Sequence, residues 1–63
     1  LNPTIGEIIV DGLTIPQWIA IHSIDGRILK EIYTQDIIPI DDLASGIYFI
    51  KLGKYYHKIR LDK

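Results

Sequence analysis

Apolar and polar residues alternate along most of this 63-residue chain, and turn-forming residues recur at intervals of about ten positions. A period of two matches the β-strand, in which successive side chains point to opposite faces of a sheet. No segment repeats its apolar residues with the period of a helix. The pattern therefore predicts an all-β fold, specifically a small immunoglobulin-like antiparallel β-sandwich of six to seven short strands.

The expected sandwich covers residues 7–63, and residues 1–6 are interpreted as the end of a linker. The Asn2-Pro3-Thr4 segment and Gly6 resist regular structure, which places the boundary there. A chain of this length makes one small domain at most, so we expect no second core. The expected strands are residues 7–13, 17–24, 27–33, 37–40, 47–52 and 55–63.

Alternation assigns side chains to the two faces of each expected strand. Ile8 and Val10 face inward in the first strand, whereas the register of the third strand stays open because Ile28 and Leu29 are both apolar. Residues 47–52 are apolar on both faces, which predicts a central strand. In the second strand, Ile19 and Ile21 share one face, and the other face carries Trp18, Ala20 and His22.

Several turn residues limit where strands can end or lie. Asp25-Gly26 predicts a type I′ hairpin turn, which needs positive φ angles at both of its central residues. Pro39 cannot donate to a strand ladder, so we expect its strand at an edge, or with the missing donor pointing outward. Asp41 and Asp42 are expected to cap the following turn, and Gly46 to adopt a conformation denied to other residues.

Charge is distributed unevenly along the chain, although the net charge is only −1. Residues 1–50 contain seven acidic and two basic residues, whereas residues 51–63 contain five basic residues and one acidic residue. The acidic part would repel phosphate, so we expect no nucleic-acid partner. The C-terminal lysines can protect an edge strand against aggregation, or they can form a basic terminus that a partner recognises.

Composition narrows the protein class further. The chain has no cysteine, which excludes disulfides and thiolate metal sites. No apolar run approaches the roughly eighteen residues that span a membrane, so we expect no transmembrane segment. The chain opens with Leu1-Asn2-Pro3-Thr4 rather than with a methionine or a signal-peptide pattern. We therefore expect it to be the C-terminal part of a longer protein.

Candidate catalytic residues are present but form no recognisable site. Ser23 and Ser45 are candidate nucleophiles, and His22 and His57 are candidate bases, yet no motif such as G-x-S-x-G accompanies them. The two histidines lack a third ligand at a recognised metal spacing. The side chains of Asp41-Asp42 diverge on a turn, which favours the capping role. We expect no catalytic residue, no metal and no cofactor, and we expect that the protein is not an enzyme.

Five aromatic side chains need a separate explanation. They can form a platform for stacking on sugars, as in carbohydrate-binding sandwiches, or they can cover the second face of a sheet and contact another protein. Both interpretations remain open from composition alone. The residues are Trp18, Tyr33, Phe49, Tyr55 and Tyr56.

Four blocks follow one another along essentially the whole chain. Asn2-Pro3-Thr4 and Gly6-Glu7 precede the first apolar strand, and IAIHSIDGRIL at 19–29 joins an apolar strand, a glycine turn and a basic residue. The third block is IPIDDLASGIYFIK at 38–51, and the chain closes with HKIRLDK at 57–63. In this order and at these spacings, the blocks resemble the type A C-terminal sorting domain of the type IX secretion system, found on exported proteins of Bacteroidetes.

This resemblance implies a non-catalytic targeting signal. Such a domain accompanies a cargo domain, N-terminal to it, through the periplasm, and the outer-membrane translocon then recognises it. In many cargoes a surface sortase cleaves upstream of the domain and attaches the cargo to anionic lipopolysaccharide. The implied localisation is therefore the periplasm in transit, followed by the outer-membrane surface or the extracellular space.

The resemblance also assigns translocon recognition to a set of residues. Within this set we expect Lys58, Ile59 and Lys63 to form the recognised end, with Gly46 and Tyr48 holding two strands in register beneath it. The alternative function is an accessory adhesive or carbohydrate-binding β-sandwich module of an exported enzyme. The complete set is Gly46, Tyr48, Lys51, Lys58, Ile59 and Lys63.

Overall fold

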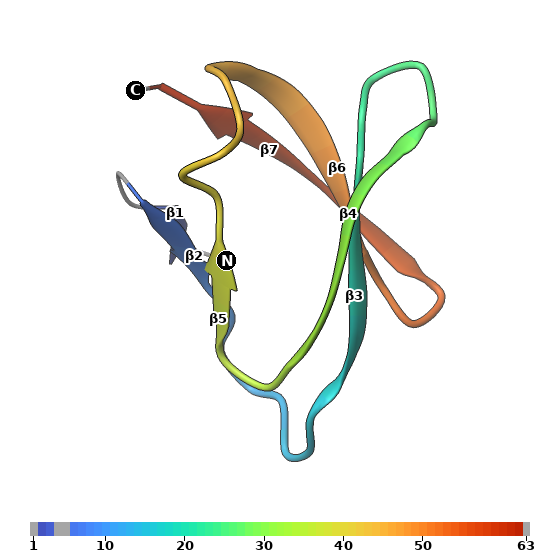
Figure 1. The fold of residues 1–63 in the computed structure, drawn as a ribbon. Coiled ribbons are helices and arrows are strands. Elements are labelled where there is room, and N and C mark those ends of the chain that lie inside the picture. Colours follow the sequence, from blue (N-terminus) through green and yellow to red (C-terminus); the bar gives the residue numbers. More distant parts are fainter. Residues whose placement is uncertain (1, 4–5, 63) are drawn as a thin grey trace.

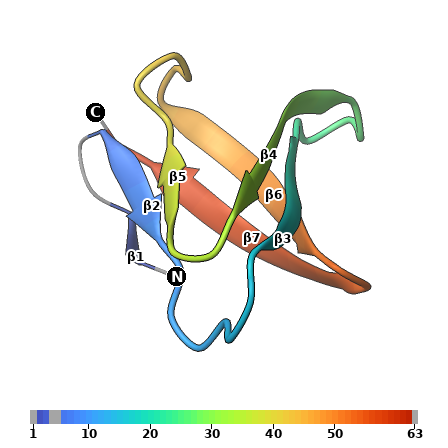
Figure 2. The ribbon, with the colours of Figure 1, turned by 60° about the horizontal axis from the view of Figure 1, so that its bottom comes forward.

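The computed structural model describes residues 2–3 and 6–62, which contain seven β-strands and no helix (Figure 1). Two antiparallel sheets face each other, which confirms the predicted all-β sandwich (Figures 1 and 2). The strands are β1 (Asn2–Pro3), β2 (Glu7–Ile9), β3 (Gln17–His22), β4 (Ile28–Thr34), β5 (Ile37–Pro39), β6 (Gly46–Leu52) and β7 (Tyr55–Leu61).

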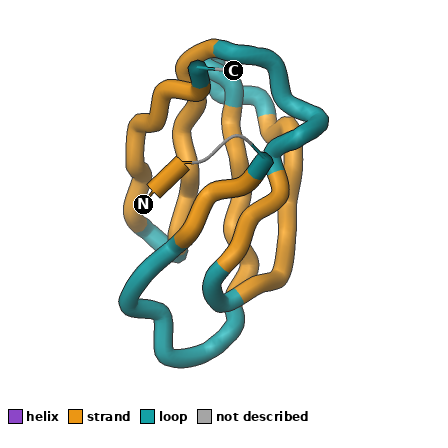
Figure 3. The backbone as a smooth tube through the Cα atoms, turned by 90° about the vertical axis from the view of Figure 1, so that its left-hand side faces the viewer, coloured by secondary structure: helices purple, strands orange, loops and turns teal. Residues whose placement is uncertain are grey.

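The order of the strands is that of an immunoglobulin-like sandwich. The smaller sheet has the order β1-β2-β5, and the larger sheet has the order β4-β3-β6-β7. In the immunoglobulin fold, strands A, B and E share one sheet, and strand C′ joins C, F and G in the other. The seven strands occupy these same positions. The loops gather at the two ends of the sandwich (Figure 3).

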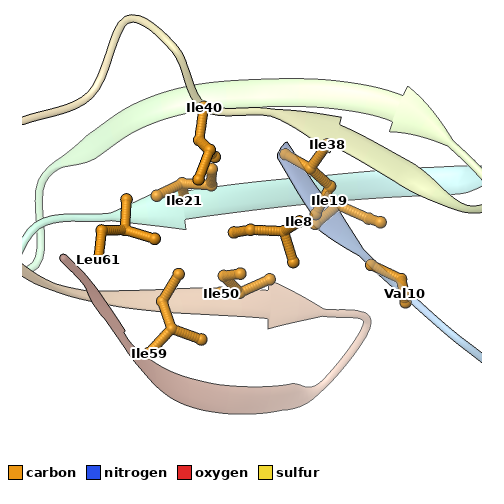
Figure 4. Packing of buried hydrophobic residues seen from close by; sticks show 9 residues of the cluster. All are labelled: Ile8, Val10, Ile19, Ile21, Ile38, Ile40, Ile50, Ile59 and Leu61. Carbon is orange, nitrogen blue, oxygen red and sulfur yellow. The ribbon is translucent and has the colours of Figure 1, made fainter. Parts of the chain in front are cut away.

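Nine buried residues form the core between the sheets, and seven of them are isoleucines (Figure 4). Branching at Cβ suits isoleucine to a pleated strand, where it fills the space between facing sheets. Ile8 and Val10, the expected inward residues of the first strand, are both in this core, and so are Ile19 and Ile21, which share one face of the second strand. No buried polar residue accompanies them in the described part of the chain. The core residues are Ile8, Val10, Ile19, Ile21, Ile38, Ile40, Ile50, Ile59 and Leu61.

The first strand is shorter than its alternating pattern predicts. β2 ends at Ile9 rather than at residue 13, because the chain beyond it no longer follows the strand ladder. Val10 instead donates its backbone N–H to the carbonyl of Asp36, at 2.7 Å. Its side chain is buried as expected. The remaining bounds of the larger strands agree with the expected ranges to within two residues, and Lys63 lies outside the described residues.

Asn2 and Pro3, which the sequence assigns to the linker, form β1 and pair with Ile9 and Ile8 of β2. Backbone pairing extends the smaller sheet here although the segment has no alternating pattern. Thr4, the third residue of this segment, lies outside the described residues.

A β-bulge settles the register of β4. The pairing between β3 and β4 shifts at Ile21 and His22, so that His22 pairs with Ile28. A bulge opposes two residues of one strand to one residue of the other. Ile28 therefore lies on the same face of the sheet as His22, which points away from the core. Ile32 lies on the opposite face and packs against the core.

The predicted type I′ turn between β3 and β4 is wrong. Of its two central residues, only Gly26 has a positive φ angle, of 93°. The N–H of Ser23 donates to the carbonyl of Arg27 at 2.8 Å, and the N–H of Gly26 donates to the carbonyl of Ser23 at 3.0 Å. These bonds close a three-residue loop with one left-handed residue. Asp25 keeps a negative φ because this loop requires the left-handed conformation only at Gly26.

Pro39 lies at a sheet edge, as predicted, since β5 is the last strand of the smaller sheet. Next to it, Lys30 of β4 joins the two sheets. Its Nζ donates to the carbonyl of Pro39 at 2.6 Å and to the Asp42 carboxylate at 2.9 Å. The Lys30 side chain is only 20% exposed, so this contact is partly shielded from water. Asp42 therefore serves as the acceptor of an inter-sheet clip.

The smaller sheet covers only part of the larger one. Along β7, Ile59 and Leu61 are buried, whereas Tyr55 and His57 are exposed although they alternate in phase with them. The first half of β7 thus extends past the core as one arm of a hairpin. Gly53 and Lys54 form the two-residue turn at its tip.

Candidate recognition surface

Gly46 and Tyr48 form a local structural unit at the start of β6. Gly46 has a φ angle of 155°, a conformation that side chains rarely adopt, which confirms the expectation for this residue. The Tyr48 ring lies beside it, since a Cβ at Gly46 would be 3.8 Å from Tyr48 Cε2. The Tyr48 hydroxyl donates to the carbonyl of Ala44 at 2.7 Å. This is the tyrosine corner of immunoglobulin-like domains, which pins the start of strand F to the preceding loop.

The remaining residues assigned to recognition lie on two different faces. Ile59 is only 7% exposed, pairs opposite Tyr48 and belongs to the core. Lys58 is exposed on the other face of β7, opposite Phe49. Lys51 lies one strand further in, with its Nζ 5.7 Å from the centroid of the Tyr56 ring. Lys63 is outside the described residues.

Lys51 and Lys58 thus belong to what we call the outer face, the side of the larger sheet that points away from the core. This face is rich in exposed aromatic and aliphatic side chains, including Trp18, which is 64% exposed. Trp18 and Tyr33 meet edge to face, with centroids 5.5 Å apart. Register and alternation place on it Trp18, Ala20, His22, Ile28, Glu31, Tyr33, Ile47, Phe49, Lys51, Tyr56, Lys58 and Arg60.

A hollow of about 270 Å³ opens on the outer face above Ala20. Along β3, Trp18 and His22 flank this small residue, and across the sheet its register partners are Glu31 and Lys51. The Glu31 carboxylate, a hydrogen-bond acceptor, and the Lys51 ammonium group, a donor, therefore lie on opposite sides of the apolar Ala20. The lining residues are Trp18, Ala20, His22, Ile28, Glu31, Lys51 and Gly53.

His22 separates this hollow from a second one of about 420 Å³, which Phe49 and Tyr56 also line. Its Nδ1 lies 3.2 Å from the carbonyl of Gly26, which can only accept, so Nδ1 carries the proton. Nε2 is then an acceptor in the neutral ring, and it is buried without a hydrogen-bond partner in the described part of the chain. The Tyr56 ring packs edge-on against the imidazole, with centroids 5.8 Å apart.

Ser23, a candidate nucleophile, stabilises the hairpin loop. Its hydroxyl donates to the carboxylate of Asp25, and its oxygen accepts the N–H of Arg27 at 3.1 Å. The hydrogen bond from Ser23 lowers the pKa of Asp25, and the nearby charge of Arg27 acts in the same direction. Residues 6–62 contain no group of three histidine or acidic side chains placed to hold a metal ion.

The sequence did not predict the hollow, although one signal for it was present. A small residue between two large ones on the same strand face leaves a gap, and Ala20 lies between Trp18 and His22 in this way. The inter-sheet clip of Lys30 had no comparable signal, because its partner is on another element.

Comparison with known proteins adds no further information. No family model, curated protein or solved structure matches this chain. No helix long and apolar enough to cross a membrane occurs in the described residues.

Proposed function

We propose that this domain is a C-terminal sorting signal, which directs a cargo protein through the outer-membrane translocon of the type IX secretion system. The order of four sequence blocks along essentially the whole chain carries the proposal. The third block runs from the last two residues of β5 through the Tyr48 corner to residue 51 of β6, and the last block begins in the middle of β7.

Structure and charge support this role. A folded sandwich that needs no disulfide can form in any compartment through which the cargo passes. Lys51 and Lys58 offer positive charge on the outer face, near the chain end. In this proposal, the translocon contacts these lysines together with Lys63. Gly46 and Tyr48 hold β6 in place, and Ile59 fastens β7 to the core, so these three residues act by positioning the basic strand.

The proposed path of the protein follows from this role. The domain crosses the periplasm behind its cargo and reaches the cell surface through the translocon. A surface sortase is the second proposed partner, since it would remove the domain from the cargo and attach the cargo to the surface. None of these steps requires catalysis by the domain itself.

A reporter fusion tests the proposal. Residues 1–63 would be fused to the C-terminus of a periplasmic reporter in a Bacteroidetes host with this secretion system. We expect the reporter at the cell surface or in the medium, and its retention in a strain that lacks the translocon. A matched fusion without residues 58–63 should stay in the periplasm. Periplasmic retention of the intact fusion would contradict the proposal.

The hollow above Ala20 favours a second candidate function, a carbohydrate-binding module. Trp18 offers an exposed ring for stacking on a sugar, and Glu31 and Lys51 offer an acceptor and a donor for hydroxyl groups. A glycan array with the 63-residue chain tests this function. Binding that Trp18→Ala abolishes would support it. Tyr55→Ala is the matched control, because Tyr55 is equally exposed, at 64%, but lies outside the hollow.

A further inference from the structure

Three of the four edge strands in the described sandwich are protected against pairing with another chain. β1 has two residues, and β5 has three, of which one is Pro39. β4 borders a β-bulge, and its Lys30 points inward to Asp42. Short edges, prolines, bulges and inward-pointing charges are the devices by which natural sheets avoid edge-to-edge association.

The fourth edge strand, β7, has none of these structural devices, and its exposed Lys58 and Arg60 protect it by charge alone. All seven of its residues pair with β6 in an unshifted register, and it contains neither proline nor glycine. Among the described strands, β6 alone is its neighbour, so one side of β7 is open (Figures 1 and 2). A regular strand of this length presents a row of unpaired N–H and carbonyl groups along that side.

Charge on β7 selects the type of strand that fits this edge. Lys58 and Arg60 are exposed on the outer face, and Lys54 precedes the strand in the turn. The acidic residue nearby is Asp62, whose carboxylate is 3.2 Å from Arg60 and largely exposed. The open edge therefore has a net positive outer side.

A second copy of this chain fits the edge poorly. In each two-fold symmetric antiparallel register that pairs most of β7 with itself, Lys58 lies opposite Lys58 or Arg60 of the other copy, or Arg60 lies opposite its Lys54. Like charges directly opposite each other destabilise a strand pair. A strand with acidic side chains at the same positions would instead form attractive pairs.

We propose that the open edge of β7 binds an extended acidic segment of a partner protein, which adds to the larger sheet as a further antiparallel strand. Carboxylates of this segment lie opposite Lys58 and Arg60, and its alternate, apolar side chains cover the inner side near Tyr55 and His57. Backbone hydrogen bonds supply affinity and the side chains supply selectivity, as in other cases of strand addition. The identity of the partner as a translocon component rests on the proposed sorting function, whereas the pairing itself does not.

Titration with a synthetic peptide tests the pairing. The probe is an acetylated peptide of alternating glutamate and valine with seven residues, the length of β7. We expect it to protect β7 amides from hydrogen exchange, with an affinity that falls as salt rises. The corresponding lysine–valine peptide should not bind. Equal binding of both peptides, or protection confined to β3 and β4, would overturn the proposal.

Substitutions to glutamate on β7 and in a distant loop separate edge pairing from general electrostatics. Replacing Lys58 and Arg60 together by glutamate reverses two cross-strand pairs, and we expect affinity for the acidic peptide to fall about tenfold or more. Arg27→Glu, in the loop at the far edge of the sheet, should leave it unchanged. Equal losses in both variants would overturn the pairing. Thermal unfolding of each variant verifies that the fold is intact.

Export of the reporter fusion is then measured with Lys58 and Arg60 both replaced by glutamate. This measurement separates strand pairing at β7 from the proposed sorting function. If the peptide binds β7 but the substituted fusion is exported normally, the role of the edge in sorting is overturned and the pairing stands. If the intact fusion is exported but the peptide does not bind, the pairing is overturned and the sorting function stands.

Discussion

The two faces of the larger sheet differ in almost every property, although their residues alternate along the same strands. The inner face carries Ile19, Ile21 and Ile50, all with no exposed surface. The outer face carries aromatic and charged residues such as Trp18 and Lys51, together with the hollow above Ala20. Buried and exposed residues thus alternate with each step along these strands.

This alternation shows how a small domain can change its surface without losing its fold. The core depends on residues at every second position, and the exposed positions between them tolerate a wider range of side chains. Substitutions on the two faces should therefore have effects of very different size on the free energy of unfolding.

The largest expected effect is on the inner face of β6. Ile50→Ala removes a fully buried side chain, and we expect a loss of about 2–5 kcal/mol in the free energy of unfolding. Ile47→Ala on the outer face of the same strand should cost less than about 1 kcal/mol, since Ile47 is 38% exposed. Urea unfolding measures both.

Because Ile50→Ala can unfold so small a domain altogether, Ile50→Val provides a measurable second variant, with an expected loss of about 0.5–1.5 kcal/mol. If Ile47→Ala and Ile50→Ala lower the free energy of unfolding equally, the expected difference between the two faces is wrong.

Lys30 sharpens the comparison, because it is a charged residue on the inner side of an edge strand. Lys30→Met keeps the length of the side chain but removes the bonds to Pro39 and Asp42. We expect a loss of about 1–2 kcal/mol in thermal or urea unfolding. The control is Arg27→Gln, whose ion pair with Asp25 is exposed on both sides and should contribute little to stability. If the control loses as much as Lys30→Met, the clip has no special role.

Tyr48→Phe tests the tyrosine corner with the loss of one oxygen atom. The hydrogen bond to Ala44 disappears while the ring stays in place beside Gly46, so we expect a loss of about 1 kcal/mol. The same substitution at Tyr33 of the outer face should have little effect on unfolding. A stability of Tyr48→Phe equal to that of the unchanged chain would show that packing of the ring suffices.

The smallest expected effect is on the outer face. Trp18→Ala removes the edge-to-face contact with Tyr33, and we expect a loss of about 0.5 kcal/mol in the free energy of unfolding. Urea unfolding followed by circular dichroism measures this without the tryptophan signal. A loss as large as that of Ile50→Ala would mean that the outer face also stabilises the fold.

The period of the sequence was sufficient to predict the sandwich and the two inward residues of its first strand, because burial of one face fixes the phase of a strand. Pro39 and Gly46 were equally predictable, since backbone restrictions act locally. The hairpin loop was not, because the choice between two loop lengths depends on hydrogen bonds of Ser23 as well as on Asp25-Gly26.

The candidate site was predictable only in part. The role of Tyr48 in holding the strand followed from the sequence block, but the hydrogen bond that performs it required the conformation of the loop. Ile59, which we expected in the recognised end, lies in the core instead, because it points to the same face of β7 as Leu61. The hollow and the open edge depend on register across three or four strands, and a single sequence does not specify which strands become neighbours.

The pairing of distant strands gives this domain a particular folding order. The hairpins β3–β4 and β6–β7 join residues close in sequence, whereas Ile8 must find Ile38 and Ile21 must find Ile50 before the sandwich closes. Hairpins form in about 1–10 μs, and distant pairings are slower because the loop between them must first be ordered. We expect stopped-flow refolding of core variants to place both hairpins in the transition state and the β2–β5 pair after it. During that interval the two hairpins have formed, but the smaller sheet does not yet cover their inner face.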